Sequence, residues 1–196
     1  MKWIYRFIFL AGLLWSGYQP FDRFTWFMEV FPAILGGTLL YFTRHSFPWC
    51  RLTYFMILVH VYVLYIGGHY TYARVPLFDW LRDFFHGSRN QYDKVGHFMQ
   101  GFVPSFLIRE FLIRKKIVYQ GKPLFFFTLF ACISISVAYE FLEWGTALAT
   151  GSGADDFLGT QGYVWDTQSD MLFATLGSLS MLLFFKHRHQ RSMAAL

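Results

Sequence analysis

Residues 124–144 read LFFFTLFACISISVAYEFLEW, an almost unbroken apolar run that ends in two carboxylates, Glu140 and Glu143. A segment of this composition is long enough to cross the hydrocarbon core of a bilayer, which takes about 20 apolar residues. A second apolar segment, residues 166–185, begins with two further carboxylates, Asp166 and Asp170. Charges are costly at such positions and tend to mark function. The two segments therefore predict a membrane protein whose candidate site lies where one ends and the other begins.

The composition also favours a membrane-embedded chain. The 196 residues are 55% hydrophobic and 22% aromatic, and only 15% are charged, which is too few to cover the surface of a soluble domain. The net charge of +5 comes from basic residues between apolar runs, where lipid headgroups and topology account for them. We therefore expect membrane lipids as partners and no nucleic acid. Two cysteines, Cys50 and Cys132, have no metal-ligand spacing and predict no disulfide.

The apolar segments predict an all-α fold, a polytopic membrane bundle of about six transmembrane helices in a single domain over residues 1–196. The first segment lacks a convincing signal-peptide cleavage site, so we interpret it as a short membrane helix. A lone histidine inside the third segment, His60, is expected to be a hydrogen-bonded packing residue. The predicted spans are residues 3–17, 26–43, 51–68, 93–113, 123–145 and 166–185.

Residues 76–86 predict one interfacial amphipathic helix. Apolar side chains recur there at helical spacing, while Asp79, Arg82 and Asp83 occupy the other face. The segment is too short and too charged to cross a bilayer. We expect it to lie at the membrane surface, and the alternative is a lid over a site.

The basic residues predict the orientation of the bundle. With six spans, the 17 Lys and Arg residues divide into twelve on the side of both termini and five on the other. The positive-inside rule then places both termini in the cytoplasm. Two tiers of polar side chains follow at the extracytoplasmic end, the inner one about 5 to 6 Å deeper at ~1.5 Å per residue. The outer tier is Asp93, Glu143 and Asp166, and the inner tier is His97, Glu140 and Asp170.

Helix capping explains only part of these tiers. Asp93 and Asp166 suit helix N-termini, but a carboxylate at a helix C-terminus is disfavoured. Buried carboxylates need a compensating cation, which here means protons, Lys94 or a divalent metal ion. The candidate catalytic residues are Glu140, Glu143, Asp170 and His97. The hypothetical metal ligands are His97, Glu140, Glu143, Asp166 and Asp170, with Asp93, Lys94 and His69 as supporting residues.

Several blocks of the chain resemble the YjdF-type bacterial inner-membrane family, a multi-pass family of uncharacterised function. They are DKVGHF (93–98), YEFLEW (139–144), DFLGTQG (156–162) and WDTQSDM (165–171), in this order. The resemblance implies localisation in the bacterial inner (cytoplasmic) membrane. It also adds Asp156, Gln161 and Trp165 as supporting site residues.

A looser similarity is to VanZ-like proteins, which carry an Asp-Lys-x-x-His block, a Glu-rich helix end and an Asp-x-x-x-Asp helix in the same order. Residues 93–97 match the first element, Glu140 or Glu143 matches the second, and Asp166 with Asp170 ahead of Gly177 match the third. The chain departs from the pattern because the Asn that often precedes the glycine is missing; Thr175 and Leu176 stand there instead.

Three functions fit the sequence. The first is a membrane enzyme with an acidic and His-containing pocket at the extracytoplasmic face, acting on a lipid-linked or phosphorylated substrate. The second is a proton-coupled transporter, but the cytoplasmic halves of the last three spans offer little polarity beyond serines. The third is a non-catalytic structural or lipid-binding protein whose carboxylates are paired with Lys94, Arg89 and headgroups.

Overall fold

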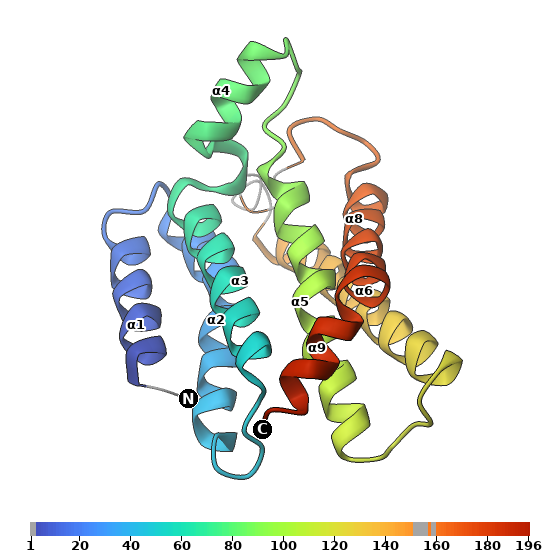
Figure 1. Cartoon of the computed structure of the whole chain (residues 1–196). Helices are drawn as coiled ribbons and strands as arrows, with labels where there is room; N and C mark the ends of the chain where they lie inside the picture. The colour runs from blue at the N-terminus through green and yellow to red at the C-terminus, as the bar shows by residue number, and fades with distance from the viewer. Residues whose placement is uncertain (1–2, 151–156, 158–159) are drawn as a thin grey trace.

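A computed structural model of the chain describes residues 3–150, 157 and 160–196, and these form helices joined by turns (Figure 1). The helices are α1 (Trp3–Gly17), α2 (Arg23–Thr43), α3 (Arg51–Tyr70), the 3-10 turn η1 (Tyr72–Arg74), α4 (Pro76–Phe84), α5 (Tyr92–Arg114), α6 (Lys122–Thr150), α8 (Asp166–Ser180), the π-helical turn η3 (Met181–Phe185) and α9 (Lys186–Met193). The prediction of an all-α, polytopic bundle is confirmed.

Length and composition support fewer spans than the sequence predicted. Within the described residues, four helical segments are long and apolar enough to cross a membrane: α2, α3, α6 and the continuous stretch Asp166–Met193. Helix α1 has only 15 residues, and α5 carries five charged residues among its 23. The predicted number of about six therefore includes one short helix and one charged helix. Helix α6 also runs to Thr150, past its predicted end at residue 145.

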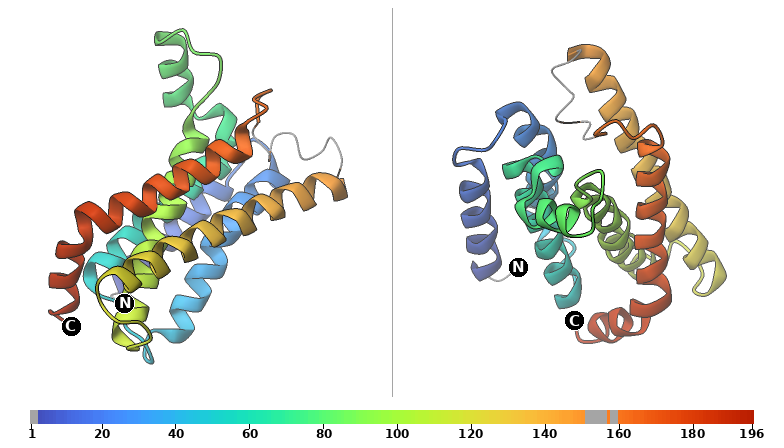
Figure 2. Two further views of the ribbon diagram at one scale, coloured as in Figure 1. Left: turned by 90° about the vertical axis from the view of Figure 1, so that its right-hand side faces the viewer. Right: turned by 90° about the horizontal axis from the view of Figure 1, so that it is seen from above.

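Helix α5 occupies the middle of the bundle. It packs against α3 on one side and against α6 and α8 on the other, while α1 and α2 lie against α3 (Figure 1). Helices α6 and α8 lie side by side and are strongly tilted (Figure 2). The start of α1 and the end of α9 lie at one end of the bundle, called the terminus end below, and α4 lies at the opposite end. The starts of α5 and α8 lie at the α4 end.

The tightest crossing in the bundle joins α5 to α8. A Cβ atom on Gly101 would lie 1.7 Å from the carbonyl oxygen of Ala174, and one on Gly177 would lie 2.0 Å from the carbonyl oxygen of Phe98. Only glycine allows the two backbones to approach so closely, as is common between membrane helices. This contact brings the polar first turns of α5 and α8 together.

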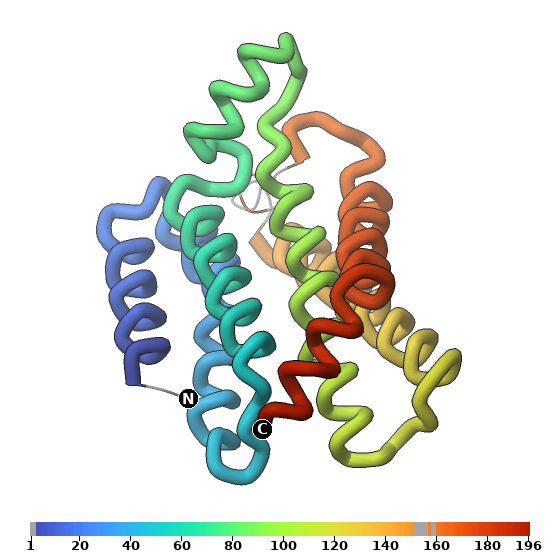
Figure 3. The backbone as a smooth tube through the Cα atoms, viewed as in Figure 1, coloured from blue at the N-terminus to red at the C-terminus, as the bar shows by residue number. Residues whose placement is uncertain are grey.

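The C-terminal segment folds back under the bundle. After α8 the chain turns through η3, so that α9 runs toward the start of α3 (Figure 3). There the Ser192 hydroxyl accepts a hydrogen bond from the Leu52 backbone amide over 3.2 Å. Helix α9 therefore closes the terminus end of the bundle between α3 and α5.

Two expectations about individual elements meet the structure differently. The ring of His60 is not hydrogen-bonded as predicted, because its Nε2 is buried without a partner among the described residues. Helix α4 exposes Leu77, Trp80 and Phe84, each at least 59% accessible, and projects from the end of the bundle. Its place at a membrane surface stays a prediction.

Candidate functional site

Lys94 ties α5 to α8 through three carboxylates. Its Nζ lies 2.6 Å from Asp166 Oδ1, 2.6 Å from Asp170 Oδ1 and 3.3 Å from Asp93 Oδ2. All four side chains are buried. Asp166 and Asp170 are one turn apart on the same face of α8, and both meet one ammonium group. We refer to Asp93, Lys94, His97, Asp166 and Asp170 as the carboxylate cluster.

Arg89 supplies a second buried cation from the segment that precedes α5. Its Nη1 lies 2.6 Å from Asp166 Oδ1, and its Nη2 lies 3.6 Å from Asp93 Oδ2. Asp166 was a predicted metal ligand, but its Oδ1 is shared between Arg89 and Lys94. Asp170 Oδ1 also pairs with Lys94, but it lies 3.7 Å from His97 Nε2, and Asp93, which was predicted as a supporting residue, lies 3.3 Å from the same nitrogen.

His97 lies between the carboxylates of α5, α8 and α6. Its Nε2 is 3.3 Å from Asp93 Oδ1 and 3.7 Å from Asp170 Oδ1. Its Nδ1 is 3.1 Å from Gln100 Oε1, an acceptor that assigns a proton to Nδ1. This leaves Nε2 to donate to Asp93 when protonated or to bind a metal when neutral, and a ring backed in this way is typical of metal-ligating histidine. Ligand atoms of Asp93, His97 and Asp170 all lie within 4.8 Å of one another.

The two α6 glutamates lie beside this cluster in different settings. Glu140 is 6% exposed, and its Oε1 lies 3.9 Å from His97 Nδ1 with no hydrogen-bond partner in the described part of the chain. Glu143 is half-buried and lines a neighbouring cavity. An incompletely satisfied buried carboxylate is costly, so Glu140 favours a proton or a cation nearby.

A cavity of about 540 Å³ opens from the cluster into the bundle. At its polar end it is lined by Asp93, His97 and Glu143, and also by Glu29 of α2. Ligand cavities in proteins are typically of this size and mostly apolar, with a few converging polar groups. The geometry therefore places the cluster at the head of a ligand-sized space.

Glu29 is a member of the site that sequence reasoning missed. It is 6% exposed, and its Oε2 accepts a hydrogen bond of 3.4 Å from the Tyr139 hydroxyl. The signal was present, because a lone carboxylate inside the apolar run of α2 is as costly as those of α6. Only the tertiary structure assigns it to the same site, through Tyr139 of α6 and through the cavity that it lines together with Asp93 and His97.

Tyr72 was also missed, and glycines make room for it. Cβ atoms on Gly67 and Gly96 would lie 2.1 and 2.5 Å from its ring atoms, so the ring fills a slot between α3 and α5. Burial raises the pKa of Tyr72 well above its ordinary value, and the nearby Glu29 carboxylate adds to this effect. Its hydroxyl therefore stays protonated beside the cavity.

Of the predicted supporting residues, Gln161 and Trp165 lie near the start of α8. The Gln161 amide accepts a hydrogen bond from the Asn90 backbone amide over 2.9 Å and donates one to the Asn90 carbonyl over 3.0 Å. This pair fastens the segment before α8 beside Arg89. Trp165 precedes α8 and is 61% exposed, and its carbonyl accepts from the Ser169 amide. Asp156 lies outside the described residues.

His69 lies apart from the carboxylate cluster. Its ring stacks on Trp15 with centroids 4.8 Å apart, and its Nδ1 is 3.1 Å from the Ser16 carbonyl oxygen. These contacts hold α1 against α3. The structure thus gives His69 a packing contact with α1 in place of the predicted supporting position.

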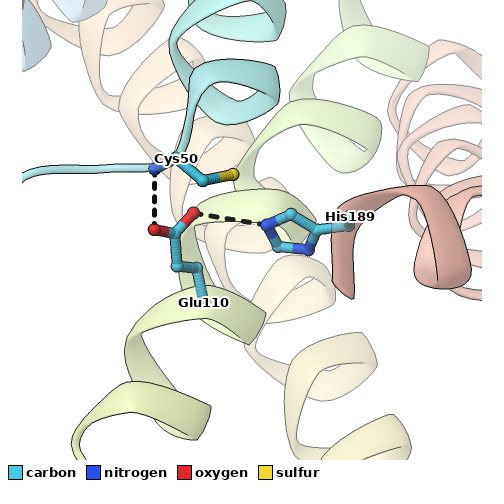
Figure 4. Close-up of side chains that lie close together, drawn as sticks. All are labelled: Cys50, Glu110 and His189. Carbon is cyan, nitrogen blue, oxygen red and sulfur yellow. Dashed lines mark hydrogen bonds and ion pairs between the residues drawn. The ribbon is translucent and has the colours of Figure 1, made fainter. Parts of the chain in front are cut away.

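A second polar cluster lies where the start of α3, the second half of α5 and α9 meet, and Figure 4 shows Cys50, Glu110 and His189 from it. Glu110 Oε1 accepts from the Cys50 backbone amide over 2.8 Å, and Oε2 accepts from the Thr53 hydroxyl over 2.7 Å. His189 Nε2 lies 3.3 Å from Oε2, and all four side chains have 0% exposure. We refer to Cys50, Thr53, Glu110 and His189 as the Glu110 cluster.

The Glu110 cluster contains metal-type ligands, but its hydrogen bonds disfavour a metal. Arg109 Nη1 lies 3.1 Å from His189 Nδ1, and a guanidinium group can only donate. Nδ1 is then the acceptor, and the ring proton on Nε2 points toward Glu110. A metal at Nε2 would require a proton on Nδ1, facing the Arg109 donor. Arg114 also pairs with Glu110 Oε1 at 2.9 Å, so the carboxylate is already neutralised.

Comparison with known proteins places the chain among bacterial membrane proteins. A family model described as "Predicted membrane protein (DUF2238)" matches residues 1–191. The "Inner membrane protein YjdF" of Escherichia coli (strain K12) is 45% identical over 181 residues, covering 92% of this chain and 87% of that protein. No solved structure matches the chain. The looser similarity to VanZ-like proteins is not shown by these comparisons.

Proposed function

This chain belongs to the DUF2238 family of predicted membrane proteins, and we propose that it is an inner-membrane enzyme that uses a divalent cation to act on a lipid-linked substrate. The polar site lies at the end of the bundle opposite both termini. The excess of Lys and Arg on the terminus side supports an extracytoplasmic location for it. There the headgroups of membrane lipids come within reach of the carboxylate cluster.

The observation that carries this proposal is the environment of His97. Its Nε2 faces Asp93 and Asp170 at 3.3 and 3.7 Å, while Gln100 holds its Nδ1 proton. One imidazole nitrogen and two carboxylate oxygens form a ligand set that suits zinc or manganese. When bound, such an ion supplies Lewis-acid activation of a headgroup oxygen or of water.

Charge also favours a cation at this site. Six buried or half-buried carboxylates surround His97, and only Arg89 and Lys94 oppose them among the described residues. Full ionisation would leave a formal excess of four negative charges, which is costly in a low-dielectric setting. A divalent ion and protonated carboxyl groups together remove most of this excess. The six carboxylates are Glu29, Asp93, Glu140, Glu143, Asp166 and Asp170.

The α6 glutamates are then the candidates for proton transfer. Glu143 lines the cavity, where it can accept a proton from an attacking water or hydroxyl group. Glu140 lies 3.9 Å from His97 Nδ1, where its charge stabilises the Nδ1–H of a metal-bound ring. General acid–base catalysis needs such groups within hydrogen-bond reach of the reacting atoms, and the polar end of the cavity provides that position.

Calorimetric titration of the purified protein in detergent with Mn²⁺ and Zn²⁺ tests the proposal. We expect stoichiometric binding that is lost in His97→Ala and Asp170→Asn and kept in His60→Ala. His60 lines the same cavity but is not part of the carboxylate cluster, so it is the matched control. Absence of binding in the unmodified protein, or equal binding in His97→Ala, overturns the metal-dependent function.

The ion pairs of Lys94 and Arg89 favour a second candidate, a lipid-binding protein without catalysis. In that case the carboxylate cluster is complete in itself, as a structural link between α5 and α8. Asp170→Asn would then lower the free energy of unfolding in detergent. Cation binding would be the same in His97→Ala, in Asp170→Asn and in the unmodified protein. The same set of proteins therefore separates the two functions.

A further inference from the structure

The cavity that begins at the carboxylate cluster extends far into the bundle. Its lining along α2 runs from Glu29 to Thr43, and along α5 from Asp93 to Leu107. Each of these stretches rises about 21 Å at 1.5 Å per residue. This exceeds half of the ~30 Å hydrocarbon core of a bilayer. A ligand that filled the cavity would therefore reach past the middle of the membrane.

The lining changes character along this length. Four of the five carboxylate and imidazole groups in the lining, Glu29, Asp93, His97 and Glu143, belong to its polar end, and the fifth is His60 of α3. Beyond them the walls are mainly apolar, and of the described lining residues none is Lys or Arg. This apolar lining includes Pro32, Leu40, Val61, Leu64, Val103 and Leu107. The shape and polarity match a hydrocarbon chain with a polar head at the carboxylate end.

The helices around the cavity leave a side from which a lipid can enter. Helices α3 and α5 pack against each other and form its floor, while α2 packs on α3 and α6 packs on α5. Leu39 of α2 and Ile135 of α6 both line the cavity, and they are 56% and 41% exposed. These exposed lining residues give the cavity two apolar edges that face the surrounding bilayer.

The charges at the polar end select the head group. Arg89 and Lys94 are engaged with Asp93, Asp166 and Asp170 and do not line the cavity. Glu29 and Glu143 face the cavity without a cation of their own among the described residues. In the absence of a metal ion, a phosphate head would meet three carboxylates, Glu29, Asp93 and Glu143, and one imidazole at this end. An ammonium head would complement Glu29 and Glu143, which are not among the three ligand atoms proposed for the metal ion.

We propose that the cavity between α2 and α6 binds the single hydrocarbon chain of an amine-bearing lipid, with its ammonium head against Glu29 and Glu143. This inference names the substrate class of the proposed enzyme and so rests on that function. Binding itself requires neither the metal ion nor turnover. It is therefore measured in the presence of a chelator, where failure of metal binding has no effect on the result.

Photo-crosslinking with a sixteen-carbon alkylamine that carries a diazirine at its methyl end tests the proposal. We expect labelling near the far end of the cavity, at Thr43, Trp49 and Leu107, and competition by unlabelled hexadecylamine. Hexadecyl phosphate should compete at least tenfold less well. Labelling confined to lipid-facing side chains such as Phe42 and Phe130 overturns the cavity assignment. Equal competition by the phosphate overturns the head-group assignment.

Two glycines provide a matched pair of variants. A Cβ atom on Gly36, which lines the cavity, would have no atom within 4 Å, and the same holds for Gly145 on the exposed surface of α6. Gly36→Phe should fill the cavity and reduce labelling at its far end at least tenfold, while Gly145→Phe should leave it unchanged. Unaltered labelling in a folded Gly36→Phe protein contradicts the proposal.

A head-group variant serves as a second test that does not alter the shape of the cavity. Glu29→Gln should weaken competition by hexadecylamine about tenfold and leave competition by hexadecanol unchanged, because only the charged head depends on the carboxylate. An equal loss for both compounds would show a general disturbance of the cavity and would overturn the proposed contact. This arm remains decisive if Gly36→Phe does not fold.

Discussion

The carboxylate cluster and the Glu110 cluster are built from similar residues but differ in what surrounds their histidines. His189 receives a donor from Arg109 at Nδ1, so its Nε2 proton points toward Glu110. His97 has an acceptor, Gln100 Oε1, at Nδ1, so its Nε2 faces two carboxylates. Glu110 has hydrogen-bond partners on both oxygens, whereas Glu140 Oε1 has none among the residues described. The difference indicates that the neighbours of a buried His–carboxylate pair decide whether it forms a structural link between helices or a ligand site.

The largest effect is expected from Glu110→Ala. Removing the carboxylate leaves the Arg114 guanidinium without its counter-ion, and it leaves the Cys50 amide, the Thr53 hydroxyl and His189 Nε2–H without an acceptor. The expected cost is about 3–5 kcal/mol in the free energy of unfolding. Denaturant unfolding in mixed micelles measures the loss. Asp83→Ala is the control, because this carboxylate is 70% exposed and should change stability little. A loss of stability for Glu110→Ala no larger than that of the control would contradict the role of the Glu110 cluster as a structural link between helices.

Lys94→Met separates the two clusters more sharply. The substitution leaves Asp170 Oδ1 without its 2.6 Å partner, which should cost about 1–3 kcal/mol for an unsatisfied buried group. A free cation concentration of 100 times the dissociation constant should restore up to about 2.7 kcal/mol of the free energy of unfolding. Unfolding with and without Mn²⁺ measures both effects.

Arg114→Met is the matched control for this rescue, because it removes the 2.9 Å partner of Glu110 Oε1. Added Mn²⁺ should not restore the stability of this variant. If Mn²⁺ restored the stability of both variants equally, or restored neither, the distinction between a ligand site and a structural link would be wrong.

Gln100→Leu tests the hydrogen bond behind the proposed ligand. Loss of the acceptor at His97 Nδ1 should reduce cation affinity about 10–100-fold, as is typical when a residue that orients a metal ligand is removed. Calorimetric titration gives the affinity. Gln190→Leu, which removes the acceptor of Arg109 Nη2 beside His189, should leave the affinity unchanged. A similar loss in both variants would assign the effect to general destabilisation.

The smallest effect is expected outside both clusters, at Asp22. Its Oδ1 accepts a 2.7 Å hydrogen bond from the Thr25 amide and caps α2, so Asp22→Ala should cost ~1 kcal/mol. This hydrogen bond lowers the pKa of the Asp22 carboxyl. The stabilisation is therefore present above the pKa of the unfolded chain and is lost as pH falls through the lowered pKa of the folded state. Unfolding of both proteins over a range of acidic pH should show their stabilities converging; a constant difference would contradict the cap.

The sequence placed the helices well because bilayer burial imposes a simple rule on composition. Long apolar runs bounded by charges predicted α2, α3, α6 and α8, and helical spacing predicted α4. Helix α5 was predicted between Asp93 and the basic residues that follow residue 113. Its five charged residues nevertheless exclude it from the helices that are apolar enough to cross a membrane. Those charges are tolerated because Lys94, Arg109 and Glu110 each meet a partner inside the bundle.

The site was predictable only in part. Residues near the ends of α5, α6 and α8 could be brought to one level by counting turns, and the structure does bring Asp93, His97 and Asp170 together. Counting could not show that Arg89 and Lys94 share Asp166, nor that His69 packs on α1. Counting turns also missed Glu29, because the sequence around a single carboxylate does not show which helix packs against it.

What the sequence determined by itself is that this chain is a helical membrane protein with its unusual carboxylates near one end, because hydrophobic burial and the cost of a charge act on each segment separately. What only the tertiary structure decided is which polar atoms remain available for a ligand. The close backbone approach at Gly101 and Gly177 sets the distance between α5 and α8, and that distance determines which carboxylates Lys94 neutralises. The apolar run 124–144 contains Glu140 and Glu143, but their neighbours across the bundle give these two carboxylates their different settings.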